Sequence, residues 1–296
     1  MEKQLKQTAC WFVILMLTLP SCSPKKNEVQ EETEILPDVQ EYILTEIWST
    51  PEGLKTPESV LYDPASDILY VTNINGAPTE KDGNGFISKL TKDGVIETLE
   101  WTTGLNAPKG MAIKEDFLYV SDIDELVEVS LATGEVKNRY KGEGAEFLND
   151  VAVGNDGIIY VTDMNAGKVY TLANGTFEEW ITLDLKSPNG LYHDGQHLYV
   201  GSSQAVSKIN KEGQVNKYCV APSGVDGLKP TQNGTFIVSD WVGHVHLVKP
   251  GEEPILLLDT SGESINAADH EFIQEENILL VPTFGDDRVV AYKLVM

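Results

Sequence analysis

The chain has 296 residues, with 22 Lys and Arg against 46 Asp and Glu and a formal net charge of −24 at pH 7. This length suits one large domain or two small ones, and an apolar share of 41% is enough to build a sizeable core. So negative a chain disfavours nucleic acid as a partner and argues against a basic membrane-binding face, whereas it tolerates a divalent metal ion.

Residues 1–21 are predicted to be a lipoprotein signal peptide. Lys3 and Lys6 precede an apolar run over residues 9–19, which is too short to span a bilayer. The run ends in Leu19-Pro20-Ser21-Cys22, which resembles the bacterial lipobox, in which the cysteine is acylated and becomes the mature N-terminus. We therefore expect export to the bacterial cell envelope and anchoring through Cys22, on the periplasmic or surface side. An ordinary cleaved signal is the alternative.

Residues 22–41 are polar and acidic, which predicts a flexible, self-repelling tether ahead of a folded domain at 42–296. The domain contains a single cysteine, Cys219, so it has no internal disulfide, and we expect Cys219 to be a small buried hydrophobe.

Six copies of one pattern fill this domain. Each copy opens on a polar residue, continues with a short apolar run, and reaches a second apolar run several residues later. The opening residues fall at positions 58, 109, 149, 189, 226 and 269. Their mean spacing of about 42 residues lies in the range of four-stranded propeller blades.

The pattern predicts an all-β fold, a six-bladed β-propeller. Short runs rich in Val, Ile, Tyr and Thr, broken by Asp-Gly or Asn-Gly, are typical of strands and tight turns. No sustained helical period supplies the helices of a TIM barrel. Residues 42–48 form a strand-like run ahead of the first copy, and residues 288–294 close the last copy. We expect the N-terminal strand to complete the last blade and seal the ring.

Pseudo-rotation would gather the six opening residues at one mouth of the central channel. Three carboxylates in a narrow channel raise one another's pKa, and a dication would neutralise them. Oxygen ligands favour Ca²⁺, Mg²⁺ or Mn²⁺ over a soft metal. We expect one divalent cation, calcium first, with Mg²⁺, Mn²⁺ or Zn²⁺ as alternatives. The expected ring is Glu58, Lys109, Asn149, Asn189, Asp226 and Asp269.

Residues 41–296 resemble the senescence-marker-protein/gluconolactonase (regucalcin-like) family of six-bladed propellers. The likeness is carried by Pro57-Glu58, Asn149-Asp150, Pro188-Asn189-Gly190-Leu191 and Asp226-Gly227. It implies one metal ion that polarises the carbonyl of a lactone or ester, with Asp226 as the catalytic group assisting proton transfer. The metal ligands that it implies are Glu58, Asn149, Asn189 and Asp226.

Some positions depart from that family pattern. Phe147 stands where members that open sugar lactones often carry Arg, which puts sugar-acid recognition in doubt and leaves an apolar or aromatic substrate edge open. Lys109 either pairs with an acidic residue and weakens the metal site or holds an anionic substrate group. Asp269 is a candidate fifth ligand and His270 a candidate base, unless both only satisfy backbone groups.

We expect a metal-dependent hydrolase of a lactone or related ester. Its partner would be a small-molecule substrate, with no nucleic acid, and it would reach the membrane only through its N-terminal lipid. The alternative is a non-enzymatic propeller, in which an ion or a Lys109 salt bridge plugs the channel and one face binds a ligand or protein. The sequence has no G-x-S-x-G elbow, so it gives no support for an α/β serine hydrolase.

Overall fold

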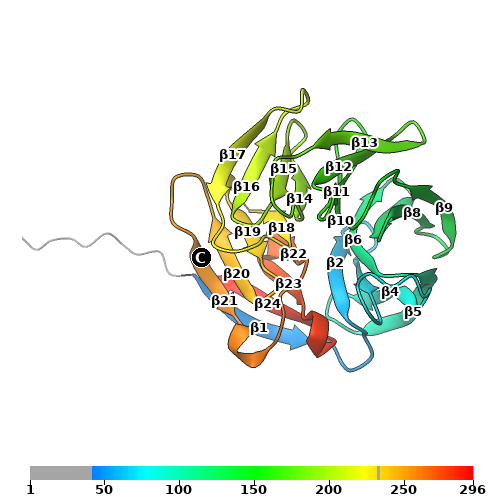
Figure 1. The fold of residues 1–296 in the computed structure, drawn as a ribbon. Helices are drawn as coiled ribbons and strands as arrows, with labels where there is room; N and C mark the ends of the chain where they lie inside the picture. The colour runs from blue at the N-terminus through cyan, green and yellow to red at the C-terminus, as the bar shows by residue number, and fades with distance from the viewer. Residues whose placement is uncertain (1–41, 232–233, 296) are drawn as a thin grey trace, which may run out of the picture. The chain divides into compact units, whose positions relative to one another are not determined.

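The computed structural model describes residues 42–231 and 234–295, which form six antiparallel four-stranded sheets. Figure 1 shows these sheets as blades around a common axis, so the predicted six-bladed β-propeller is confirmed. The expected signal peptide at 1–21, the acylated Cys22 and the tether at 22–41 lie outside the described residues. Within the part described, no helix is long and apolar enough to cross a membrane.

The first three blades follow one another along the chain, and in each the first strand is the innermost. The first blade contains β2 (Pro57–Asp63), β3 (Ile68–Asn73), β4 (Gly85–Thr91) and β5 (Ile96–Leu105). The second contains β6 (Pro108–Lys114), β7 (Phe117–Asp122), β8 (Glu125–Ser130) and β9 (Val136–Lys141). The third contains β10 (Leu148–Val153), β11 (Ile159–Asp163), β12 (Lys168–Ala173) and β13 (Thr176–Thr182).

The last three blades repeat this order, except that the sixth takes its outermost strand from the N-terminal side of the domain. The fourth blade contains β14 (Leu191–His193), β15 (Leu198–Gly201), β16 (Ala205–Ile209) and β17 (Val215–Val220). The fifth contains β18 (Leu228–Pro230), β19 (Phe236–Ser239), β20 (His244–Val248) and β21 (Ile255–Asp259). The sixth contains β22 (Glu271–Ile273), β23 (Ile278–Pro282), β24 (Val289–Val295) and β1 (Ile43–Ser49). Short 3₁₀ turns are η2 (Ser261–Glu263), η3 (Gln274–Glu276) and η4 (Phe284–Asp286).

Burial decreases from the inner to the outer strand of a blade. In the third blade almost every residue of β10 and β11 is buried, whereas the outermost strand β13 has no buried residue. The two inner strands of a blade are buried on both faces because neighbouring blades pack against them. The two apolar runs of each sequence repeat are therefore the two inner strands of a blade.

The ring closes between the last blade and the first. Strand β1 pairs antiparallel with β24, with Ile43 opposite Val295 and Ser49 opposite Val290. One hydrogen-bonded ladder thus holds both ends of the domain, and the predicted closing strand is confirmed.

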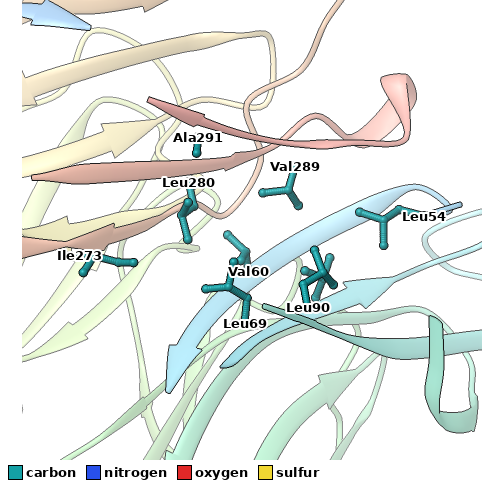
Figure 2. Close-up of a cluster of buried hydrophobic side chains, with 9 residues drawn as sticks. Leu54, Val60, Leu69, Leu90, Ile273, Leu280, Val289 and Ala291 are labelled. Atoms are coloured by element: carbon teal, nitrogen blue, oxygen red, sulfur yellow. The ribbon is translucent and has the colours of Figure 1, made fainter. Parts of the chain in front are cut away.

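Apolar side chains bury the seam between these two blades. Figure 2 shows Val60 and Leu69 of the first blade lying near Leu280 and Ile273 of the sixth. Val60, Leu69 and Leu280 have no exposed surface. The same cluster continues through Leu54, Leu90, Val289 and Ala291.

Deletion of residues 42–49 from the full chain is expected to abolish cooperative thermal unfolding. The sixth blade would lose its outer strand, and the two ends of the ring would lose their common ladder. Circular dichroism during heating measures this. The exposed residue Thr45 lies on the same strand, and the control Thr45→Ala is expected to melt close to the wild type. A deletion variant that melts like the wild type would show that the ring closes elsewhere.

Candidate functional site

The innermost strands of the six blades contact their neighbours in a closed circle around the axis. Five of the six predicted ring residues line one cavity of about 490 Å³ at this axis. They comprise all four predicted metal ligands and Lys109, and all are almost completely buried, with 1 to 7% of their surface exposed. The five are Glu58, Lys109, Asn149, Asn189 and Asp226.

Hydroxyl groups on the second strand of a blade hold the backbone of the ring residues across blade boundaries. Thr162 Oγ1 in β11 accepts a hydrogen bond from the Asp150 N–H at 3.0 Å and donates to the Asn189 carbonyl at 2.9 Å. Ser121 in β7 likewise donates to the Asn149 carbonyl. Because adjacent inner strands belong to separate sheets, these hydroxyls satisfy backbone groups that no ladder reaches.

Aspartates at the ends of second strands hold the loops that enter the cavity. The Asp163 carboxylate accepts hydrogen bonds from the N–H groups of Glu146 and Phe147, at 2.7 and 3.1 Å. Asp122 accepts in the same way from the Ala107 N–H at 2.8 Å. This role was not predicted from the sequence, although a Ser/Thr-Asp pair is repeated there at 121–122, 162–163 and 239–240.

Two glycines beside ring residues allow the inner strands to approach closely. A Cβ on Gly190 would lie 2.5 Å from the Asp226 carbonyl oxygen, and one on Gly110 would lie 2.6 Å from the Asp150 Cα. No real side chain makes such contacts, so both positions require glycine. The Asn189-Gly190 pair therefore marks close packing of blades and is not the turn of a hairpin.

Glu58, Asn149, Asn189 and Asp226 form the polar floor of the cavity. Burial raises the pKa of the carboxyl groups of Glu58 and Asp226. It raises the pKa of Asp226 to about 7, with a further increase from the charge of Asp269 and an opposing effect of the hydrogen bond from Asn189. Burial and then the charge of Asp226 hold the pKa of Glu58 well above its usual range, against the opposing charge of Lys109. Both groups would ionise more readily beside a bound cation.

Two buried oxygen atoms at this floor have no hydrogen-bond partner within the described residues: Glu58 Oε2 and Asn189 Oδ1. Asn189 Nδ2 donates to Asp226 Oδ1 at 2.7 Å, so the amide leaves its oxygen as a free acceptor. A buried acceptor without a partner costs about 1–3 kcal/mol. A bound cation, or donor groups of a ligand, would therefore stabilise both atoms.

The donor set at the floor fits a hard divalent cation. Across residues 42–231 and 234–295, no three Asp, Glu, His or Cys side chains lie close enough together to hold a metal by themselves. A cation here would depend on the amide oxygens of Asn149 and Asn189 as well as on the carboxylates of Glu58 and Asp226. Carboxylate and amide oxygens are the ligands that Ca²⁺ takes in proteins.

Lys109 does not pair with an acidic side chain of the described residues. Its Nζ donates to the carbonyl oxygens of Ala107 and Pro78, at 2.8 and 3.1 Å, and lies 4.4 Å from the centroid of the Phe147 ring. Burial lowers the pKa of its ammonium group, against the opposing charge of Glu58. A salt bridge that would weaken the metal site, one of the two alternatives for Lys109, is therefore absent from this part of the chain.

Neither Asp269 nor His270 borders the cavity. Asp269 Oδ2 accepts a hydrogen bond from Ser59 Oγ at 2.5 Å, and His270 Nδ1 lies 2.9 Å from Ser239 Oγ. Burial lowers the pKa of His270 to about 3, so its ring is neutral at physiological pH. Both side chains interact with hydroxyl groups of inner strands. The Asp269 N–H donates to the Glu58 carbonyl at 3.0 Å, so Asp269 lies beside a predicted metal ligand, but its carboxyl group does not line the cavity.

Apolar side chains form the wall above the polar floor. Trp241 is 52% exposed and packs edge-on against Phe284, with ring centroids 5.5 Å apart. Phe147, the position that departs from the family pattern, also borders the cavity. The remaining apolar members of the wall are Ile74, Pro78, Met164 and Val225.

Several solved structures share this fold. A protein described as a candidate gluconolactonase matches with a TM-score of 0.63 and 18% identity, over 86% of this chain and 92% of its own. A streptogramin B lyase matches with a TM-score of 0.61 and 12% identity, over 86% and 98% of the two chains. Virginiamycin B lyase from Staphylococcus aureus matches with a TM-score of 0.58 and 13% identity, over 86% and 100%. No protein-family model and no curated protein matches the chain. At these identities the likeness shows the fold alone.

In metal-free solution, acidification is expected to stabilise the wild type relative to Asp226→Asn. The pKa of Asp226 is higher in the folded chain, at about 7, than its ordinary value of 3.8. The resulting stabilisation is present below the ordinary value and is lost as the pH rises through about 7. Melting temperatures in chelator between about pH 5 and pH 8 measure the difference, which is worth up to about 1.4 kcal/mol per pH unit. Parallel profiles of the two proteins would contradict the raised pKa.

Proposed function

We propose that this protein is a metal-dependent hydrolase of a lactone or related ester. The observation that carries the proposal is the floor of the cavity, where Glu58 Oε2 and Asn189 Oδ1 are buried acceptors without a partner among the described residues. The adjoining Asn149 and Asp226 complete a donor set suited to one divalent cation. The likeness in fold to a candidate gluconolactonase is consistent with this class of reaction.

The side chains of the floor would have two roles, metal binding and proton transfer. Glu58, Asn149, Asn189 and Asp226 would hold the cation, which when bound polarises a carbonyl group and stabilises negative charge on its oxygen. Asn189 Nδ2 fixes the orientation of the Asp226 carboxyl group through Oδ1. Asp226 would accept the proton of the attacking water and return it to the leaving oxygen. The apolar wall would exclude bulk water from this floor.

The proposed location is the bacterial cell envelope, with a lipid anchor on Cys22. This part of the proposal is supported by the apolar run at 9–19 and by the lipobox-like Leu19-Pro20-Ser21-Cys22.

A panel of lactones and aryl esters tests the reaction, with Ca²⁺, Mg²⁺, Mn²⁺, Zn²⁺ or chelator added to the purified protein. We expect turnover that requires a divalent cation, and a loss of about 10²–10⁴-fold in kcat for Asp226→Asn, the range of a lost general acid–base group. The same cation is expected to raise the melting temperature of the wild type by mass action, and to raise that of Glu58→Gln much less.

Asp116→Asn is the matched control, because Asp116 is an exposed turn residue outside the cavity, and it is expected to keep full activity. Absence of turnover with every cation, together with unchanged melting temperatures, would favour the non-enzymatic propeller. Formation of an unsaturated product without oxygen from water would indicate elimination, the class of reaction in the names of two of the similar structures.

A further inference from the structure

The apolar wall of the cavity offers little to a polyhydroxylated ligand, whose polar partners are confined to the floor, Lys109 and the exposed Ser187. The wall is formed by Phe147, Met164 and the Trp241–Phe284 pair, none of which bears a hydrogen-bonding group that could replace water around several hydroxyls except the Trp241 indole N–H. Stripping hydroxyls of water without new partners is costly, whereas an apolar ring gains about 25 cal/mol for each Å² that it buries. The wall therefore favours an aromatic or branched apolar body.

Lys109 is a charged residue that lines the cavity beside this apolar wall. Its side chain is 1% exposed, and within the described residues its ammonium group has two hydrogen-bond acceptors, the carbonyl oxygens of Pro78 and Ala107. Its third proton has no acceptor there, and no carboxylate lies within ion-pair distance in that part of the chain. Carbonyl dipoles and the Phe147 face stabilise the charge only in part.

The buried Lys109 ammonium group, which has a free donor, is suited to bind an anionic group of a ligand. A charge-assisted hydrogen bond to a carboxylate is roughly twice as strong as a neutral one, and it would supply the missing counter-charge. Lys109 and Phe147 both border the cavity, so a ligand that packs on the Phe147 ring would reach the Lys109 ammonium group.

We propose that the cavity binds ligands with an aromatic or branched apolar body and one carboxylate group. The body packs against Phe147, Met164 and Trp241, and the carboxylate accepts a hydrogen bond from Lys109 Nζ. This names the substrate class of the proposed hydrolase, an apolar lactone or ester that carries an acidic group. It rests on the proposed function only for the choice of site, because ligand binding can be measured without turnover.

Isothermal titration calorimetry with three probes tests the inference on the full chain: 3-phenylpropanoate, its neutral amide 3-phenylpropanamide, and gluconate. The titrations are done in chelator, so that a carboxylate gains nothing from a bound cation. We expect 3-phenylpropanoate to bind at least about tenfold more tightly than the amide, which corresponds to one charge-assisted hydrogen bond. Gluconate is expected to bind more weakly than both, because it lacks the apolar body.

Lys109→Met keeps the apolar stem of the side chain and is expected to bind 3-phenylpropanoate and its amide equally. Lys109→Arg keeps the charge and is expected to keep the preference. Lys208→Met is the matched control, since Lys208 also lies over an aromatic ring, that of Tyr199 at 5.4 Å, but outside the cavity. Trp241→Ala is expected to weaken both phenyl probes by a similar factor.

Equal binding of the carboxylate and the amide by the wild type would overturn the inference, whatever the folding of the variants. A preference for gluconate, or a preference for carboxylate that survives Lys109→Met, would also overturn it. Cation-dependent hydrolysis without this anion preference would leave the proposed reaction standing and remove only the substrate class. A preference for the carboxylate probe without any hydrolysis would support the ligand class and contradict the proposed reaction.

Discussion

The candidate site depends on hydrogen bonds that cross from one blade to the next. Each blade is a complete sheet, so the backbone groups of an inner strand that face its neighbour have no ladder to join. Thr162 and Ser121 resolve this by bonding to the carbonyls of Asn189 and Asn149. The backbone of these two asparagines is thereby satisfied by inner-strand hydroxyls, and their amide side chains are left to face the cavity. Gly190 permits the close approach that these bonds require.

The cavity is lined by polar groups that lack a partner within the described residues. Glu58 Oε2 and Asn189 Oδ1 lack donors, and Lys109 lacks a counter-ion, all within the described residues and all deeply buried. Three further buried polar atoms of the described residues lack a partner, His197 Nδ1, Asp269 Oδ1 and His270 Nε2, but these residues do not line the cavity. Other buried polar side chains bond to each other, such as Tyr119 and Glu128 at 3.0 Å. Unmatched buried groups reduce stability, and natural proteins retain them chiefly at functional sites. Acceptors for a cation and a donor for an anion in one cavity would suit the substrate class that we propose, an ester or lactone with a carboxylate group.

The fold could be predicted from the sequence because the same strand pattern occurs six times, at the spacing of propeller blades. The repeat also predicted the six ring positions, since pseudo-rotation places equivalent backbone positions around one axis, and five of these six residues line the cavity. The choice of positions 58, 149, 189 and 226 as metal ligands came from the family resemblance and stays a prediction. Rotation does not set the direction of a side chain, however, and Asp269 bonds to Ser59 instead of bordering the cavity. The partners of Lys109 are the carbonyls of Ala107 and Pro78, and the repeat gives no sign of the contact with Pro78, which lies 31 residues away in the chain.

We propose that Glu58, Asn149, Asn189 and Asp226 together bind one divalent cation. Anomalous X-ray diffraction from crystals grown with Mn²⁺ would locate the bound ion. We expect a single strong anomalous peak within bonding distance of oxygen atoms from all four side chains. Crystals that contain Mn²⁺ but show no peak at this floor, or a peak bound only by other residues, would contradict it.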